Sequence, residues 1–304
     1  MKHLLKLLDL STEEITDILN LADQLKYEQK HGIPHNILKG QTLGMIFQKS
    51  STRTRVSFET GMYQLGGQAL FLSSRDLQIG RGEPVQDTAR VLSRYLSGIM
   101  IRTFAQKEVE DLAEYGSIPI INGLTDYCHP CQVLADLQTV REHKNKLDGL
   151  KFCYIGDGNN MANSLTVGAL KVGMSVSLGC PEGYFPDQTI IDFAKQYPGK
   201  FQIIRNPVEA AADADVVYTD VWASMGQEGE AAKRREVFKG YQINDAVMAS
   251  AKPDAMVMHC LPAHREEEIT AKVFEQHADE IFDEAENRLH AQKAVMVRLM
   301  AHEA

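Results

Sequence analysis

Hydroxyl and guanidinium side chains gather in one short segment, Ser51-Thr52-Arg53-Thr54-Arg55, directly behind the apolar run 43–47. If that run is a strand and a helix follows it, the free backbone amides of the first helical turn lie beside these side chains. Amides, hydroxyls and guanidinium groups together hold a phosphate dianion well. A nucleotide-binding Walker loop needs a glycine and a lysine that the segment does not have in register. The segment therefore predicts a site for a phosphate-bearing substrate.

Further polar groups follow later apolar runs, and chemistry in an open α/β sheet is found at these strand ends. In the first half of the chain, Arg102 follows run 98–101, and His-Pro-Cys-Gln at 129–132 follows run 118–121. In the second half, the corresponding segments are 156–160, 220–226 and 259–262. The first set offers groups for one anion and one carbonyl. The second supplies a carboxylate, an amide and a thiol, which suit an amino acid.

The apolar runs that must position these groups alternate with helix-like stretches in two series, as parallel sheets require. A capping box at 11–14 predicts a helix that runs to about Tyr27. The fold class expected is α/β with two domains, each a central, mainly parallel sheet flanked by helices, with the boundary in the polar stretch 142–149. The charge-rich stretch 227–236 is expected to be a mobile, solvated loop. The runs are 43–47, 69–72, 98–101 and 118–121 in the first series, then 151–155, 175–178, 201–204, 216–218 and 255–258.

Composition narrows the class of protein. With 304 residues and 44% hydrophobic residues, the chain can bury a substantial core, and its net charge of -9 argues against a nucleic-acid surface. No apolar stretch approaches the roughly 20 residues of a membrane span, and no leader is evident, so a cytoplasmic location is expected. Five cysteines are an odd number, which predicts reduced thiols. A phosphate pocket must then be a local island of positive charge.

The motifs Ser-Thr-Arg-Thr-Arg, His-Pro-x-Gln and His-Cys-Leu-Pro, in this order and spacing, resemble the carbamoyltransferase family nearly end to end, closing with Glu-Ala-Glu-Asn-Arg at 284–288. Asp-x-Trp-x-Ser-Met-Gly at 220–226 is similar to the members that act on ornithine. The resemblance implies two α/β domains joined by two interdomain helices. Residues 1–148 would bind carbamoyl phosphate, with a C-terminal helix of about 285–304 packing back on them, and residues 149–284 would bind ornithine.

The implied reaction is transfer of the carbamoyl group from carbamoyl phosphate to the δ-amine of L-ornithine, which gives L-citrulline and phosphate without a metal or other cofactor. In the family the enzyme is a trimer, so a homotrimer or a multiple of trimers is expected. Gln78 would complete the site of a neighbouring subunit. Donors must face both the carbonyl oxygen and the departing phosphate.

The same resemblance implies a role for each site residue. Arg102, His129 and Cys260 would take part in catalysis. Ornithine would be bound by Asn160, Asp220, Ser224 and Met225. Carbamoyl phosphate would be bound by Ser51, Thr52, Arg53, Thr54, Gln78, Arg102, His129, Pro130, Cys131, Gln132, Cys260, Leu261 and Arg288.

Simpler interpretations compete with several of these roles. Arg55 could pair with Glu59 on the helix surface, and Asn160 could be only a helix cap. Cys128-x-x-Cys131 could be a redox pair or half a zinc site, although no second cysteine pair accompanies it. At the level of function, the alternatives are a carbamoyltransferase acting on putrescine or another amine, and a dinucleotide-dependent oxidoreductase. The glycine fingerprint that the oxidoreductase needs is broken after Gly158.

Overall fold

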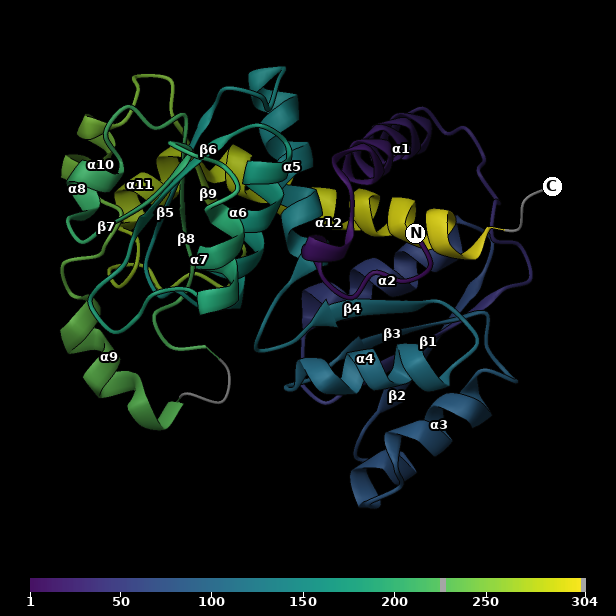
Figure 1. Ribbon diagram of the computed structural model, residues 1–304. Helices are drawn as coiled ribbons and strands as arrows, with labels where there is room; N and C mark the ends of the chain where they lie inside the picture. Colours follow the sequence, from purple (N-terminus) through teal and green to yellow (C-terminus); the bar gives the residue numbers. More distant parts are fainter. Residues whose placement is uncertain (225–227, 302–304) are drawn as a thin grey trace. The chain divides into compact units, whose positions relative to one another are not determined.

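The computed structural model describes residues 1–224 and 228–301, and it divides the chain into two compact units (Figure 1). The first unit is Met1–Gln138 with Asn287–Ala304, and the second is Thr139–Glu286. The chain passes from one unit to the other within α5 (Pro130–Lys144) and returns within α12 (Ala278–Met300). The expected α/β class, with two parallel sheets and two joining helices, is confirmed.

The first unit is built on a four-stranded parallel sheet with the order β2-β1-β3-β4. Because β1 and β3 are neighbours in register, with Phe47 opposite Arg102, the segments that follow them begin at the same edge of the sheet. The amide of Gln48 donates to the carbonyl of Arg102 at 2.9 Å, which ties these two strand ends together. The strands are β1 (Thr42–Phe47), β2 (Gln68–Ser73), β3 (Gly98–Arg102) and β4 (Ile120–Leu124), with helices α1 (Thr12–Lys30), α2 (Thr52–Gln64), α3 (Val85–Leu92) and α4 (Gln106–Tyr115) and the short 3-10 helices η1 (Leu7–Asp9) and η2 (Gln78–Arg81).

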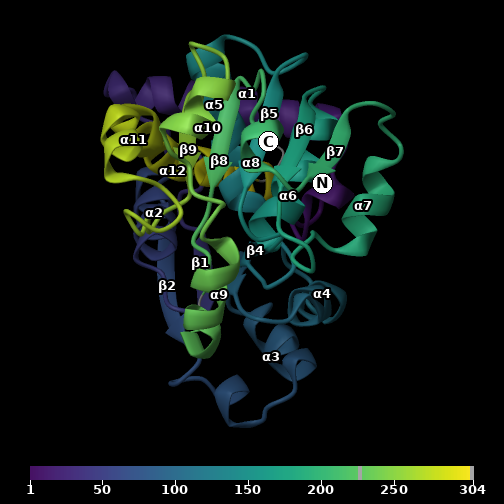
Figure 2. The ribbon, with the colours of Figure 1, turned by 90° about the vertical axis from the view of Figure 1, so that its left-hand side faces the viewer.

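The second unit carries a five-stranded parallel sheet with the order β7-β6-β5-β8-β9, which Figure 2 shows from one side. Its adjacent strands β5, β8 and β9 end next to one another, since Ile155 lies opposite Thr219 and Thr219 lies opposite His259. The strands are β5 (Lys151–Ile155), β6 (Ser175–Gly179), β7 (Phe201–Ile204), β8 (Val216–Thr219) and β9 (Met256–His259), with helices α6 (Asn160–Lys171), α7 (Gln188–Ala194), α8 (Pro207–Ala210), α9 (Ala231–Phe238), α10 (Asp245–Ser250) and α11 (Ala271–Gln276) and the 3-10 helix η3 (Glu228–Glu230).

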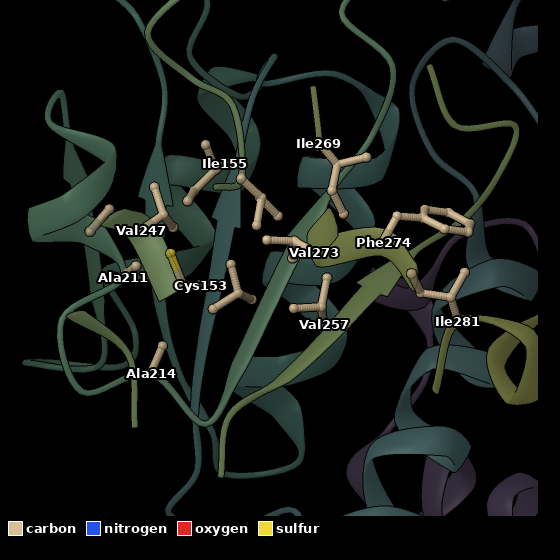
Figure 3. Packing of buried hydrophobic residues seen from close by; sticks show 13 residues of the cluster. Cys153, Ile155, Ala211, Ala214, Val247, Val257, Ile269, Val273, Phe274 and Ile281 are labelled. Carbon is tan, nitrogen blue, oxygen red and sulfur yellow. The ribbon is translucent and has the colours of Figure 1, made fainter. Parts of the chain in front are cut away.

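Apolar side chains of the second sheet pack against helices on one of its faces (Figure 3). Val217 and Val257 point from β8 and β9 into this cluster, where they meet Val247, Val273 and Phe274 from α10 and α11. Each of these side chains is almost completely buried, and full burial of such a side chain contributes about 1.5–3 kcal/mol. This core fixes the position of the strand ends.

The capping box predicted at the start of α1 is confirmed. Ser11 Oγ accepts from the amide of Glu14 at 3.1 Å, and Glu14 Oε2 accepts from the amide of Ser11 at 2.9 Å. The helix continues to Lys30, one turn beyond the predicted end at Tyr27. It continues because apolar side chains recur on its buried face as far as Leu25, and no glycine or proline interrupts the next turn.

One predicted element is wrong in its secondary structure. The charge-rich stretch was expected to be a mobile, solvated loop, but its described part, residues 228–236, forms η3 and the first turns of α9. Residues 229–236 are mostly exposed, as expected, but Arg234 is buried. Charge density favours a solvated surface only when no buried partner exists, and Arg234 has one in the loop after β5. In the described part of the chain, no helix is both long enough and apolar enough to cross a membrane.

Candidate active site

Ser51 caps the start of α2, where the phosphate segment was predicted. Its Oγ accepts from the amide of Thr54 at 3.2 Å and donates to Thr54 Oγ1 at 3.1 Å, so the first turn is capped and the two hydroxyls face each other. Thr52 and Arg53 are the first residues of this helix, and the positive end of its dipole lies beside them. The arrangement leaves backbone amides and hydroxyls at one edge of the first sheet, as an anion requires.

Arg288, from α12, joins this cluster. Its Nη2 donates to Thr54 Oγ1 at 3.1 Å, and its Nη1 donates to Gln132 Oε1 at 2.7 Å. Gln132 in turn donates through Nε2 to Asp136 at 2.8 Å. Thr54, Gln132 and Arg288 are all buried, with exposed fractions of 0%, 1% and 3%. The structure therefore brings together predicted site residues from segments 51–54, 132 and 288.

His129 precedes α5 and is buried beside three arginines. Burial lowers the pKa of its imidazole well below 6.5, and the charges of Arg288, Arg102 and Arg53 lower it further. The imidazole is thus neutral near pH 7, with one N–H to donate and one nitrogen to accept. Arg102 itself is buried at the end of β3.

Arg55 is not part of this cluster. Its Nε donates to Glu59 at 3.0 Å, and its guanidinium lies 3.8 Å from the ring centre of Phe71. The simpler interpretation of Arg55, a surface pair with Glu59, is confirmed.

The two cysteines of the Cys-x-x-Cys segment are buried thiols. Burial raises the pKa of Cys128 and of Cys131 to about 12, so neither is a thiolate at neutral pH. The Cys131 thiol donates to the carbonyl of Asn122 at 3.4 Å, and both cysteines are unpaired with any other cysteine. Because the thiolate is the reactive form, this environment does not suit redox chemistry. Pro130 is the first residue of α5, where proline is well tolerated.

In the second unit, the Asp220 carboxylate is the centre of a hydrogen-bonded group. Its Oδ2 accepts from Asn159 Nδ2 at 2.9 Å, and its Oδ1 accepts from the Cys260 thiol at 3.1 Å and from the amide of Val221 at 2.8 Å. These residues follow β5, β8 and β9, the three neighbouring strands. A nearly buried carboxylate that accepts from three neutral donors suits a substrate ammonium group.

The other residues expected to bind ornithine follow Asn159 and Asp220 closely in the sequence. Asn160 is the first residue of α6, but it is not the cap, because Asn159 Oδ1 accepts from the amides of Met161 and Ala162 at 2.9 and 3.3 Å. Ser224 is partly buried. Met225 lies outside the described residues.

Arg234 and Asp157 form a buried ion pair that sequence reasoning missed. Arg234 Nη1 donates to Asp157 Oδ2 at 2.7 Å and to the carbonyl of Trp222 at 3.0 Å. Burial raises the pKa of Asp157, and Arg234 lowers it again in part. No sign of this pairing is visible in the sequence, because Arg234 stands in a run of charged residues that is typical of an exposed surface.

Two buried glutamates accept hydrogen bonds from the first residue of the His-Cys-Leu-Pro segment. His259 Nδ1 accepts from the amide of Leu261 at 2.9 Å, so its Nε2 carries the proton that Glu268 Oε1 accepts at 2.9 Å. Glu284 accepts from the amide of His259 at 2.8 Å. Leu261 is held at φ 58°, in the left-handed region.

Gln78, which was expected to complete a neighbouring site, is exposed and lies in the first unit at the start of η2.

Within the described ranges, the cluster with donor atoms close enough for a metal ion is His264, Glu267 and Glu268. Glu267 already pairs with Arg235 at 3.0 Å, and Glu268 Oε1 accepts from His259 and from the amide of His264. Glu267 and Glu268 Oε1 thus both have protein partners.

Comparisons with known proteins agree with this geometry. The family model described as the carbamoyl-P binding domain of aspartate/ornithine carbamoyltransferase matches residues 2–142, and the Asp/Orn binding domain model matches residues 148–299. An ornithine carbamoyltransferase of Thermococcus kodakarensis is 54% identical over 303 residues, covering 98% of this chain and 96% of the relative. One from Geobacter metallireducens is 56% identical over 300 residues, covering 98% and 99%.

A solved structure extends the similarity to the fold. Ornithine carbamoyltransferase from Pyrococcus furiosus superposes with a TM-score of 0.95 at 52% identity, covering 100% of this chain and 98% of that one. Both units, both family models and nearly the whole length of these relatives are thus accounted for, and the chain belongs to the aspartate/ornithine carbamoyltransferase family.

Proposed function

We propose that this protein transfers the carbamoyl group from carbamoyl phosphate to the δ-amine of L-ornithine, giving L-citrulline and phosphate. The observation that carries the proposal is the buried cluster of Thr54, Gln132 and Arg288 beside a neutral His129. It combines fixed positive charge with neutral donors, as an acyl phosphate such as carbamoyl phosphate needs. The family model that matches this part of the chain is a carbamoyl-P binding domain, and full-length relatives are named for ornithine.

In this proposal the phosphate lies at the start of α2, against Ser51, Thr52, Arg53 and Thr54, with Arg102 as a further cation. The carbamoyl oxygen accepts from His129 and Gln132, and Arg288 reaches carbamoyl phosphate from α12. Pro130 and Cys131 shape the same turn. As the amine attacks, the new C–N bond forms, negative charge grows on this oxygen, and the C–O bond breaks so that its electron pair leaves with phosphate. One donor aimed at such an oxygen is worth about 2.7–4 kcal/mol of barrier.

Ornithine is proposed to bind in the second unit. Asp220 would pair with its α-ammonium group, and Asn160, Ser224 and Met225 would contact the same end of the molecule. Cys260 and the carbonyl of Leu261 would lie beside the δ-amine. The Cys260 thiol already donates to Asp220, which makes it part of the same hydrogen-bonded group. The amine must be neutral to attack, and its surplus proton can leave with the phosphate product.

The proposed assembly is a homotrimer, or a multiple of trimers, in which Gln78 completes a neighbouring site. It is supported by the exposure of Gln78 and by Leu70 and Phe71, which are exposed on the edge strand β2. An edge strand with exposed apolar side chains is a site of association. We also propose a cytoplasmic location and a place in arginine metabolism.

The experiment that tests the function is citrulline formation from carbamoyl phosphate and ornithine, with putrescine and aspartate as competing acceptors. Arg53→Ala tests the phosphate site, and Arg55→Ala is its matched control because Arg55 is occupied by Glu59. We expect turnover with ornithine that R53A abolishes and R55A preserves. A preference for putrescine would overturn the role given to Asp220 and Ser224. Absence of product with all three amines would overturn the enzymatic function.

A further inference from the structure

The guanidinium group of Arg288 donates to Thr54 and Gln132, and further contacts can fix its orientation. Nη1 and Nη2 donate to those two partners, and Nε is the third nitrogen of the guanidinium group. A long side chain has several rotamers, and holding it in one costs about 1.5–2 kcal/mol. Groups that hold it in advance lower this cost at the moment of binding.

Gln292, one helical turn after Arg288, supplies that contact. Its amide has one orientation that satisfies both ends: Oε1 accepts from Nη2 and Nε of Arg288 at 2.9 and 3.0 Å, while Nε2 donates to Ser57 Oγ at 2.5 Å. In the reverse orientation, two donors would face each other. Gln292 is fully buried. The guanidinium group of Arg288 is therefore held by hydrogen bonds from Nε and Nη2 to a residue of its own helix.

Ser57 connects this contact back to the phosphate segment. It stands on α2 three residues after Thr54, and its Oγ lies 3.2 Å from the carbonyl of Thr54, to which it donates. One turn later, a Cβ at Gly61 would stand 2.9 Å from the Met296 side chain, so α2 and α12 are closely packed (Figure 1). The chain of contacts Thr54, Ser57, Gln292 and Arg288 closes on itself. It fixes the distance between the two helices at the level of the site.

The neutrality of Gln292 matters as much as its position. A glutamate of the same shape could accept the same two bonds, but its charge would cancel that of Arg288. The charge of Arg288 is felt in the site, because it lowers the pKa of the buried His129. A phosphate dianion gains from this charge only while no carboxylate neutralises it.

From these contacts we propose that Gln292 is a positioning residue, which aims the Arg288 guanidinium at the phosphate-bearing substrate and leaves its positive charge intact. The inference rests on the proposed function for the identity of the substrate, and its own content is the role of Gln292 and Ser57 in the anion site of the first unit.

Three variants test it. Gln292→Glu keeps the shape and the two bonds from Arg288, but it loses the N–H that donates to Ser57 and adds a negative charge that offsets the charge of Arg288. Gln292→Leu leaves the charge of Arg288 unopposed but removes all three bonds. Ser57→Ala removes only the hydroxyl that orients the amide. The matched control is Gln29→Glu, which adds the same charge at an exposed position of α1. Measurements are KM for carbamoyl phosphate and for ornithine, kcat, the Kd for inorganic phosphate by calorimetry, and thermal unfolding.

We expect Q292E and Q292L each to weaken phosphate binding and to raise KM for carbamoyl phosphate about tenfold or more, with KM for ornithine within about twofold of the wild type. Q292E should unfold at or above the temperature of Q29E, because the introduced carboxylate gains an ion pair with Arg288. If Gln292 had only a structural role, the variants with weaker phosphate binding would also unfold at lower temperature. S57A should shift the same constants in the same direction by about threefold, and it decides the matter if Q292L does not fold.

The inference is overturned if folded Q292E binds phosphate as tightly as Q29E, or if folded Q292L and S57A retain the KM of the wild type for carbamoyl phosphate. Calorimetry with phosphate separates this result from a failure of the proposed function. A wild-type protein that makes no citrulline would refute the function, and the affinities of the variants for phosphate would still report on Gln292.

Discussion

One nitrogen atom of Arg234 joins two loops of the second unit: Nη1 lies 2.7 Å from the carboxylate of Asp157 and 3.0 Å from the carbonyl oxygen of Trp222. Asp157 follows β5, and Trp222 follows β8. The same two loops contribute Asn159 and Asp220 to the group proposed to bind ornithine. The ion pair between Arg234 and Asp157 thus helps to position the Asp220 carboxylate, although it does not contact Asp220.

Loss of this arginine should destabilise the protein. Arg234→Met leaves a buried carboxylate without its cation, which costs about 3–5 kcal/mol. The neighbouring Arg235, which is exposed and pairs with Glu267, provides the control, and R235M should change stability by no more than about 0.5 kcal/mol. The free energy of unfolding in urea measures both. The double variant D157N R234M should recover most of the loss, and equal stability of R234M and R235M would contradict the assignment.

The neutral imidazole of His129 has a consequence for the pH profile. Burial and three nearby arginines keep its pKa well below 6.5, so His129 stays neutral above that pH and lowers activity only when the pH falls far enough to protonate it. We expect kcat/KM to show no break near pH 6.5 that depends on this residue. His129→Leu, which removes the donor, should lower kcat by about 100- to 1,000-fold, the range for a lost oxyanion donor. A break near pH 6.5 that disappears in H129L would contradict the neutral form.

Asp220→Asn should separate the two substrates. The amide keeps the size of the side chain but removes the charge that would pair with the α-ammonium group, and a lost charged hydrogen bond costs about 1.5–3 kcal/mol. We therefore expect the KM for ornithine to rise about 10- to 100-fold. Calorimetry with phosphate should give an unchanged Kd, because that site belongs to the first unit. A D220N variant with normal KM for ornithine would exclude this role.

Lys293 predicts a pH-dependent stability. Its Nζ is buried against His35 Nε2 at 3.1 Å, and burial lowers its pKa from 10.5 to about 8, although Glu28 opposes the change. Between these two values the unfolded chain binds more protons than the folded chain. The destabilising effect is therefore complete below about pH 8 and is relieved as the pH rises toward 10.5.

Lys293→Met matches the size of the lysine side chain and has no charge to lose. The stability of the wild type relative to K293M should rise between pH 8 and pH 10, as measured by urea unfolding at each pH. His35 Nδ1 faces the carbonyl of Ile33 and the carboxylate of Glu28, and Lys293 and burial lower its own pKa, so His35 does not titrate in this window. A difference between the two proteins that does not vary with pH would refute the lowered pKa.

Local signals in the sequence predicted a large part of this structure. The capping box of α1, the alternation of apolar runs with helices and the polar groups behind each run could all be recognised because they depend on neighbours in the chain. Most of the predicted strand positions agree with the structure. The fourth run is the clearest shift, since β4 begins at Ile120 rather than at residue 118. The motif Ser-Thr-Arg-Thr-Arg and its companions were enough to indicate the family.

What the sequence determined by itself was therefore which residue types stand at each strand end, and hence the class of chemistry. Only the tertiary structure decided which ends become neighbours and which charges are buried. The pairing of Arg234 with Asp157 spans 77 positions, and the bond from Arg288 to Thr54 spans 234. Such contacts, and the lowered pKa of His129 that depends on them, arise from burial and distance in the folded chain, which no local pattern of residues records.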